Sequence, residues 1–142
     1  MDTVRTLVFG GGEIHDWQGI QPKLVAALEA SDAFELATAQ EDLDALLDLD
    51  AYDVLVFHYT VGTISDAQRD ALSSWLMGGK GYVGIHSAAD SFRDDPAYRN
   101  MVGGHFITHR ASISVGVGIV FRISKVSSEI GGRWSAILDS CL

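Results

Sequence analysis

The sequence predicts an α/β domain built on a three-layer, flavodoxin-like parallel sheet. Short apolar runs alternate along the chain with helical patterns, which implies crossover connections of one hand and parallel strands. The run at residues 53–59 is apolar on both faces, as is typical of a parallel strand covered by helices. We expect the local strand order 2-1-3-4.

The first half of the chain contains the clearest strand and helix signals. Residues 4–9 form an apolar run that ends in three glycines, which indicates a strand leading into a loop. A helix is expected over 19–30, with Pro22 in its first turn, where a missing N–H is tolerated. Residues 34–39 are a second strand, and 41–49 place three leucines on one helical face amid acidic residues.

Clearer start and stop signals mark the next helices. Ser65 and Gln68 form a capping box that opens a helix running to about Met77, and Gly78-Gly79 ends it. Residues 81–86 predict the next strand, and Pro96 opens a short helix over 96–101. Residues 112–123 fit one long strand or a hairpin. Residues 124–142 show no clear hydrophobic periodicity.

Composition limits the classes of partner and site. The chain has 142 residues, which suits one domain, and a net charge of -9 with no basic stripe, which disfavours nucleic acid and anionic membranes. Its one cysteine, Cys141, excludes an internal disulfide and a CxxC site. The first residues lack a leader pattern and no apolar run reaches membrane-span length, so we expect a cytoplasmic protein.

Histidines follow three of the predicted strands. Ligands of open parallel sheets bind outside the carboxyl ends of the strands, near the point where the strand order reverses. His15, His58 and His86 fall at those ends. His86 occupies the turn where a hydrolase or an amidotransferase carries its nucleophile. An imidazole cannot perform the usual nucleophilic chemistry there, so the possible roles of His86 are metal binding, proton transfer or ligand contact.

Each of these residues also has a structural interpretation. Asp16, next to His15, either belongs to the site or caps the following helix. For His58 we favour a strand-end histidine bonded to the backbone. Asp90 could orient a histidine or cap a helix, and we favour the cap. Ser87 is a candidate ligand contact, but it has no base partner for a triad.

The glycines and aromatic residues near these loops are weaker candidates. Gly10, Gly11 and Gly12 either allow close approach of a ligand or form a flexible turn, and they match no phosphate-loop motif. Trp17 and Tyr59 could stack on a sugar ring, although rings in such positions more often belong to the core or rim.

With these residues in view, the chain resembles the ThuA-like (trehalose utilisation) family, which has a class I glutamine amidotransferase-like fold. The resemblance rests on residues 10–16, 79–92, 96–98 and 103–109 and covers about residues 4–110. It implies a role in carbohydrate metabolism and a polar pocket lined by His15, His86 and His109. The elbow has no cysteine, so glutamine hydrolysis is not implied, and convergence of the three imidazoles would suit zinc.

The chain departs from the family pattern after His109, which is followed by Arg110. We therefore expect a ThuA-like domain over residues 1–110 and an atypical segment over 111–142, with a strand or hairpin and a disordered tail. This end resembles a truncated or frame-shifted sequence. An unfinished sheet would leave 112–123 as an open edge, which predicts a homodimer.

The leading hypothesis is a protein that acts on a sugar or sugar derivative. His86 would be the acid/base or metal ligand, assisted by His15 and His109, with Asp16 orienting an imidazole. Two alternatives stay open: a non-catalytic sugar- or nucleotide-binding module in which the three glycines cradle an anion, and a truncated product without activity.

Overall fold

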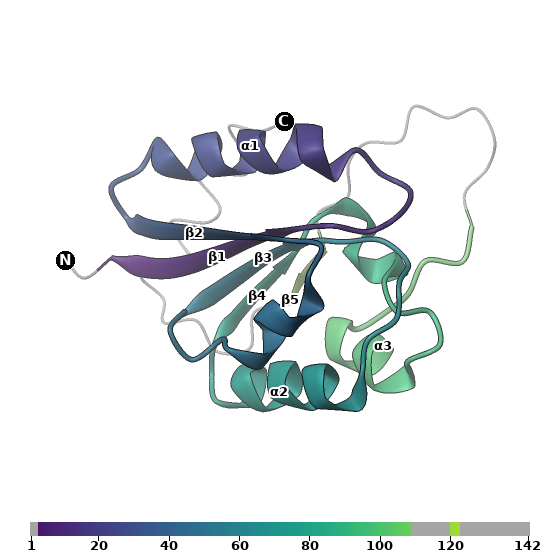
Figure 1. Cartoon of the computed structure of the whole chain (residues 1–142). Coiled ribbons are helices and arrows are strands. Elements are labelled where there is room, and N and C mark those ends of the chain that lie inside the picture. The colour runs from purple at the N-terminus through teal and green to yellow at the C-terminus, as the bar shows by residue number, and fades with distance from the viewer. Residues whose placement is uncertain (1–2, 109–119, 123–142) are drawn as a thin grey trace.

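The computed structural model describes residues 3–108 and 120–122, and its centre is a five-stranded sheet (Figure 1). The strands lie in the order β2-β1-β3-β4-β5, so the predicted order 2-1-3-4 is confirmed. The first four are parallel, and β5 is antiparallel to β4. The strands are β1 (Val4–Gly10), β2 (Phe34–Gln40), β3 (Val54–His58), β4 (Gly81–Gly84) and β5 (Val120–Arg122).

Helices cover both faces of the sheet and complete the three layers (Figure 1). Helix α1 (Trp17–Glu29) lies on one face, and α2 (Asp66–Met77) and α3 (Pro96–Val102) lie on the other. Two short 3₁₀ helices, η1 (Leu43–Leu47) and η2 (His86–Asp90), fill connections. The predicted capping box is present: Ser65 Oγ accepts from Gln68 N, and the Gln68 side chain accepts from Ser65 N.

Strand β3 supplies both apolar cores because successive side chains of a strand point to opposite faces. Leu55 and Phe57 belong to the larger core, beneath α2 and α3. Val54 and Val56 belong to the smaller core, beneath α1. All five residues of β3 are buried, as expected for a central parallel strand.

Three sequence expectations are corrected in detail. Strand β4 ends at Gly84 rather than at residue 86, because the backbone leaves the extended region and enters η2. Helix α1 begins at Trp17, so Pro22 lies in its second turn rather than its first. Leu47 is half exposed, whereas Leu43 and Leu46 are buried, because the segment forms a 3₁₀ helix, which has a different period.

The predictions for residues 111–142 fall almost wholly outside the described residues. Residues 120–122 are the exception, and they form β5 at the end of the sheet beside β4. Within the described part of the chain, no helix is both long and apolar enough to cross a membrane.

Candidate functional site

Two histidines from separate loops meet at the carboxyl edge of the sheet. His15 lies between β1 and α1, and His86 follows β4 after a single intervening residue. Their ring centroids are 4.4 Å apart and the rings lie edge to face, at 75°. The predicted convergence of His15 and His86 is therefore present in the structure.

His58, at the last position of β3, lies next to this pair. Its ring centroid is 6.5 Å from that of His15, and the residue is fully buried. Neither ring nitrogen has a hydrogen-bond partner among the described residues. The expected backbone-bonded histidine is therefore wrong, and a buried polar atom without a partner costs about 1–3 kcal/mol.

Burial and the neighbouring imidazole rings lower the pKa values of His58 and His86. Burial lowers the pKa of His58 to about 4, and the neighbouring rings of His86 and His15 add to the effect. Burial and then the proximity of His15 lower the pKa of His86. Uncharged imidazole has a free lone pair that can bind a metal, and at His86 it can also accept a proton, whereas the buried ring of His58, with its pKa of about 4, is a weak base near neutral pH.

Unusual backbone conformations surround the histidines. His86 has φ +50°, Val61 +64° and Phe92 +51°, all in the left-handed region that side chains disfavour. A β-bridge joins Val61 to Ser91, and Phe92 N donates to Val61 O at 2.9 Å. Backbone strain of this kind gathers at functional sites and is retained only where the surroundings enforce it.

One polar pair connects the loops that follow β3 and β4, and a second lies within the loop that follows β4. Thr60 Oγ1 and Ser87 Oγ share a short hydrogen bond. The buried Asp90 carboxylate accepts two hydrogen bonds from Arg93, at 2.8 and 2.7 Å, which raise the pKa of Arg93. Asp90 therefore binds Arg93 and caps neither η2 nor α3, and no local sequence pattern indicates Thr60 or Arg93.

The glycine loop lies against the end of β3. Gly11 N donates to His58 O at 3.0 Å. Gly12 has φ +96°, and a Cβ there would overlap the Thr60 backbone. The close approach of Gly11 and Gly12 is therefore to Tyr59 and Thr60, directly after β3, and Gly10 packs against Trp17 and Gln21 of α1.

Three other candidate residues have structural roles. Asp16 caps α1, since its Oδ1 accepts from Gly19 N at 2.9 Å. Trp17 is buried against Gly10. Tyr59 is buried among the rings of Phe9, Phe57 and Phe92, and burial raises its pKa.

The metal prediction involves His15, His86 and His109. His109 lies outside the described residues. Within residues 3–108, no three His, Cys, Asp or Glu side chains are grouped to hold a metal ion. The zinc site stays a prediction.

Sequence comparison assigns the chain to a family. The model of the ThuA family, described as trehalose utilisation, matches residues 5–135. The chain belongs to the ThuA family. The match continues past residue 110, where the resemblance noted in the sequence ends, and no curated protein sequence matches the chain.

Two solved ThuA-like structures have the same fold. A protein from Parabacteroides merdae matches with a TM-score of 0.64 and 22% identity, covering 71% of this chain and 38% of that one. A protein from Bacteroides uniformis matches with a TM-score of 0.55 and 22% identity, covering 71% of this chain and 44% of that one. The present chain thus spans about two fifths of the length of the structures it matches.

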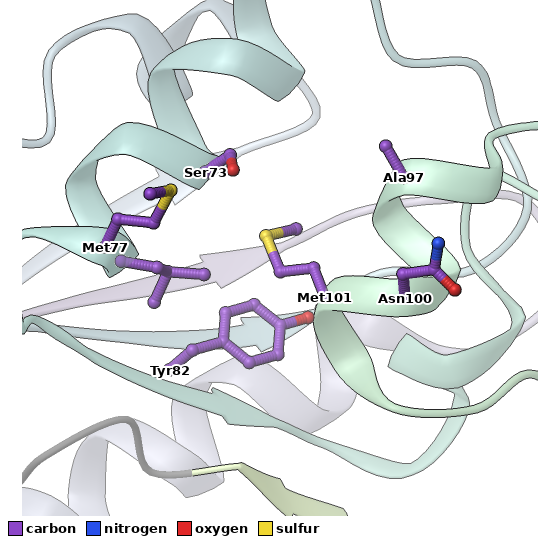
Figure 2. Close-up of a pocket in the computed structure, with 7 residues that line it drawn as sticks. Ser73, Met77, Tyr82, Ala97, Asn100 and Met101 are labelled. Carbon is purple, nitrogen blue, oxygen red and sulfur yellow. The ribbon is translucent and has the colours of Figure 1, made fainter.

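A groove of about 440 Å³ in this ThuA chain has no histidine among its described lining residues (Figure 2). Tyr82 of β4 lies between walls formed by the last turns of α2 and by α3. This groove and the histidine cluster are therefore separate features of the fold.

Proposed function

We propose that this ThuA chain binds a carbohydrate or carbohydrate derivative at the carboxyl edge of its sheet, with His15 and His86 as a proton-transferring pair. The observation that carries the proposal is the 4.4 Å edge-to-face contact of the two rings, with His86 held at φ +50° directly after β4. The family description, trehalose utilisation, supports a sugar as the ligand class.

Acid–base chemistry suits this pair better than nucleophilic chemistry. His86 is exposed and can reach a bound molecule, and its lowered pKa favours the form that accepts a proton. A second imidazole in contact can donate or accept in turn. Ser87, the nearest hydroxyl in sequence, is hydrogen-bonded to Thr60, and no base for it is evident among the described residues.

The buried ring of His58, beside His15, supports the same proposal. A buried, uncharged ring beside the pair lowers the local polarity, which strengthens each electrostatic interaction with a ligand. A group that costs stability without forming any bond is best explained by a role in function.

The test compares His86→Ala and His15→Ala with the parent chain and with His105→Ala, which removes an exposed histidine from another segment. Trehalose, glucose and a panel of simple sugars serve as probes in calorimetry, and any hit is followed by NMR for conversion. Loss of a general acid or base is expected to reduce turnover by about 10²–10⁴-fold.

The proposal predicts that both site variants lose turnover while all three variants keep a cooperative thermal transition. Equal binding and turnover in His86→Ala and in the parent chain would contradict it. Binding that needs His86 without any turnover would instead identify a sugar-binding module.

A further inference from the structure

The turn that carries His86 is fixed at its start by the neighbouring strand. Ile85 N donates to Phe57 O of β3 at 2.9 Å. Ala88 N donates to Ile85 O at 3.1 Å, which closes the turn around His86. His86 itself has φ +50°, a conformation that costs energy and persists only where the surroundings enforce it. The conformation of His86 therefore also depends on what holds Ala88, at the far end of the turn.

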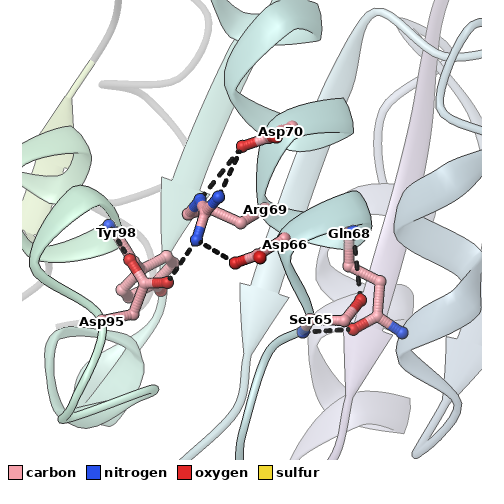
Figure 3. A network of polar contacts seen from close by, with 7 residues as sticks. All are labelled: Ser65, Asp66, Gln68, Arg69, Asp70, Asp95 and Tyr98. Atoms are coloured by element: carbon pink, nitrogen blue, oxygen red, sulfur yellow. Dashed lines mark hydrogen bonds and ion pairs between the residues drawn. The ribbon is translucent and has the colours of Figure 1, made fainter.

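A buried tyrosine of α3 holds this far end. Tyr98 OH donates to Ala88 O at 2.9 Å. Ala88 O also accepts from Ser91 N at 3.3 Å, but that bond lies within the same stretch of chain and does not attach the turn to another element. Tyr98 is fully buried, and its backbone N donates to Asp95 Oδ1 at 2.7 Å (Figure 3). The turn is therefore tied to β3 at one end and to α3 at the other.

A second tyrosine sets the direction of the hydrogen bond to the turn. The hydroxyl oxygens of Tyr82 and Tyr98 lie 2.7 Å apart. Since the one hydroxyl proton of Tyr98 goes to Ala88 O, Tyr82 OH must donate to Tyr98. Burial raises the pKa of both phenols, so both keep the protons that these bonds need. The bonds thus run from Tyr82 to Tyr98 to Ala88, and the last of them is the one that reaches the turn.

We propose that Tyr98 is a positioning residue for His86. Its hydroxyl fixes Ala88 and thereby keeps the His86 ring in edge-to-face contact with the His15 ring, with 4.4 Å between the centroids. Tyr98 acts through the turn, because its fully buried side chain cannot touch a bound molecule. The inference rests on the proposed function where turnover is concerned, whereas the contact between the two rings can be measured without any ligand.

Two substitutions separate positioning from packing. Tyr98→Phe removes the bond to Ala88, whereas Tyr82→Phe removes another buried hydroxyl of the same network and leaves that bond in place. Each full-length variant is prepared with isotope-labelled histidine. The nuclear Overhauser effect between the ring protons of His15 and His86 is then recorded without ligand, and His15→Ala and His86→Ala serve to assign the signals.

Tyr98→Phe should lose this Overhauser effect, and Tyr82→Phe should keep it at the intensity of the parent chain. Both variants should unfold cooperatively at a lower temperature than the parent chain, since each loses a buried hydrogen bond. An effect that persists in Tyr98→Phe would overturn the proposal. Loss of the effect in both variants would also overturn it, because general loosening of the packing would then be the cause.

A double variant, Tyr82→Phe/Tyr98→Phe, replaces Tyr98→Phe if that single variant does not fold. Removing both hydroxyls leaves no phenol without an acceptor, and such a paired apolar replacement can be nearly neutral for stability. Ala88 O still loses its bond to α3, so the double variant should also lose the Overhauser effect. Retention of the effect in this variant would contradict the proposal.

Kinetics give a second readout, with trehalose or any other sugar of the panel that the parent chain converts. Tyr98→Phe should lower kcat by up to about 100-fold, because a misplacement of about 1 Å between reacting groups can cost that much. KM should change little, since the buried phenol does not touch the sugar, and Tyr82→Phe should change kcat far less. An unchanged kcat in Tyr98→Phe would overturn the proposal, whereas a parent chain that converts no sugar would contradict the proposed function alone.

Discussion

At the scale of single residues, His58 differs most from what its sequence position suggests. A histidine at a strand end normally finds a backbone partner, and nothing in the local sequence distinguishes this one. Its isolation results from three segments packing around it, which no local pattern encodes. His86 was easier to predict, because the turn after a buried strand is a recognisable position even when the residue in it is unusual.

His58 should make the stability of the fold depend on pH. The pKa of its imidazole is 6.5 in the unfolded chain and about 4 when folded. Between those values the unfolded chain binds a proton that the native chain does not, so stability falls as the pH drops from 6.5 to 4, by roughly 3 kcal/mol. Urea unfolding at several pH values measures this slope.

The variant His58→Leu should remove most of that slope without lowering stability at pH 7, since an apolar group replaces two polar atoms that have no partner. His105→Leu, at an exposed position, should leave the slope unchanged. A slope retained in His58→Leu would show that other groups cause the pH dependence.

At the scale of elements, local signals predicted the starts of α2 and α3 well and the end of β4 poorly. The capping box at Ser65 and the proline at Pro96 act within one turn, so the sequence alone specifies them. The end of β4 depends on the left-handed conformation of His86, which its tertiary surroundings impose. The pairing of β5 with β4 joins residues far apart in sequence, and no local pattern reveals it.

The Asp95 carboxylate links α2 to α3 and has two roles, which substitutions can separate (Figure 3). Asp95 caps α3 by accepting from Tyr98 N at 2.7 Å, and its other oxygen lies 3.3 Å from Arg69. Arg69 also pairs with Asp66 and Asp70. Asp95→Ala should lose the cap, at a cost of about 1 kcal/mol.

Asp95→Asn separates the two roles because asparagine is an equally good cap without the charge. Thermal or urea unfolding should find this variant much closer to the parent chain than Asp95→Ala. Equal destabilisation by both substitutions would mean that the ion pair with Arg69, rather than the cap, holds α3 in place.

At the scale of the whole molecule, alternation of strands and helices predicted the layers, the strand order and the edge at which the histidines meet. The prediction rests on general rules of connection between parallel strands, which hold for any sequence of this pattern. The histidines converge because three parallel strands end at one edge. These rules do not predict which ring nitrogens of the histidines form hydrogen bonds.

The terminal position of β5 bears on assembly. Among the described strands β5 lies at the end of the sheet, with β4 as its one neighbour. A terminal strand can pair with the same strand of another molecule, so the homodimer stays a prediction. Light scattering during gel filtration measures the mass; a monomer of 15.3 kDa over a wide concentration range would contradict the expectation.

The three imidazoles come from positions 15, 58 and 86, at or after the ends of β1, β3 and β4. Bringing such distant points together requires closure of two long loops, a step with a large entropic cost that slows the folding of parallel topologies. The cluster consequently exists only once β1, β3 and β4 have assembled. Proton transfer between His15 and His86 would then require that β1 and β4 have joined the sheet.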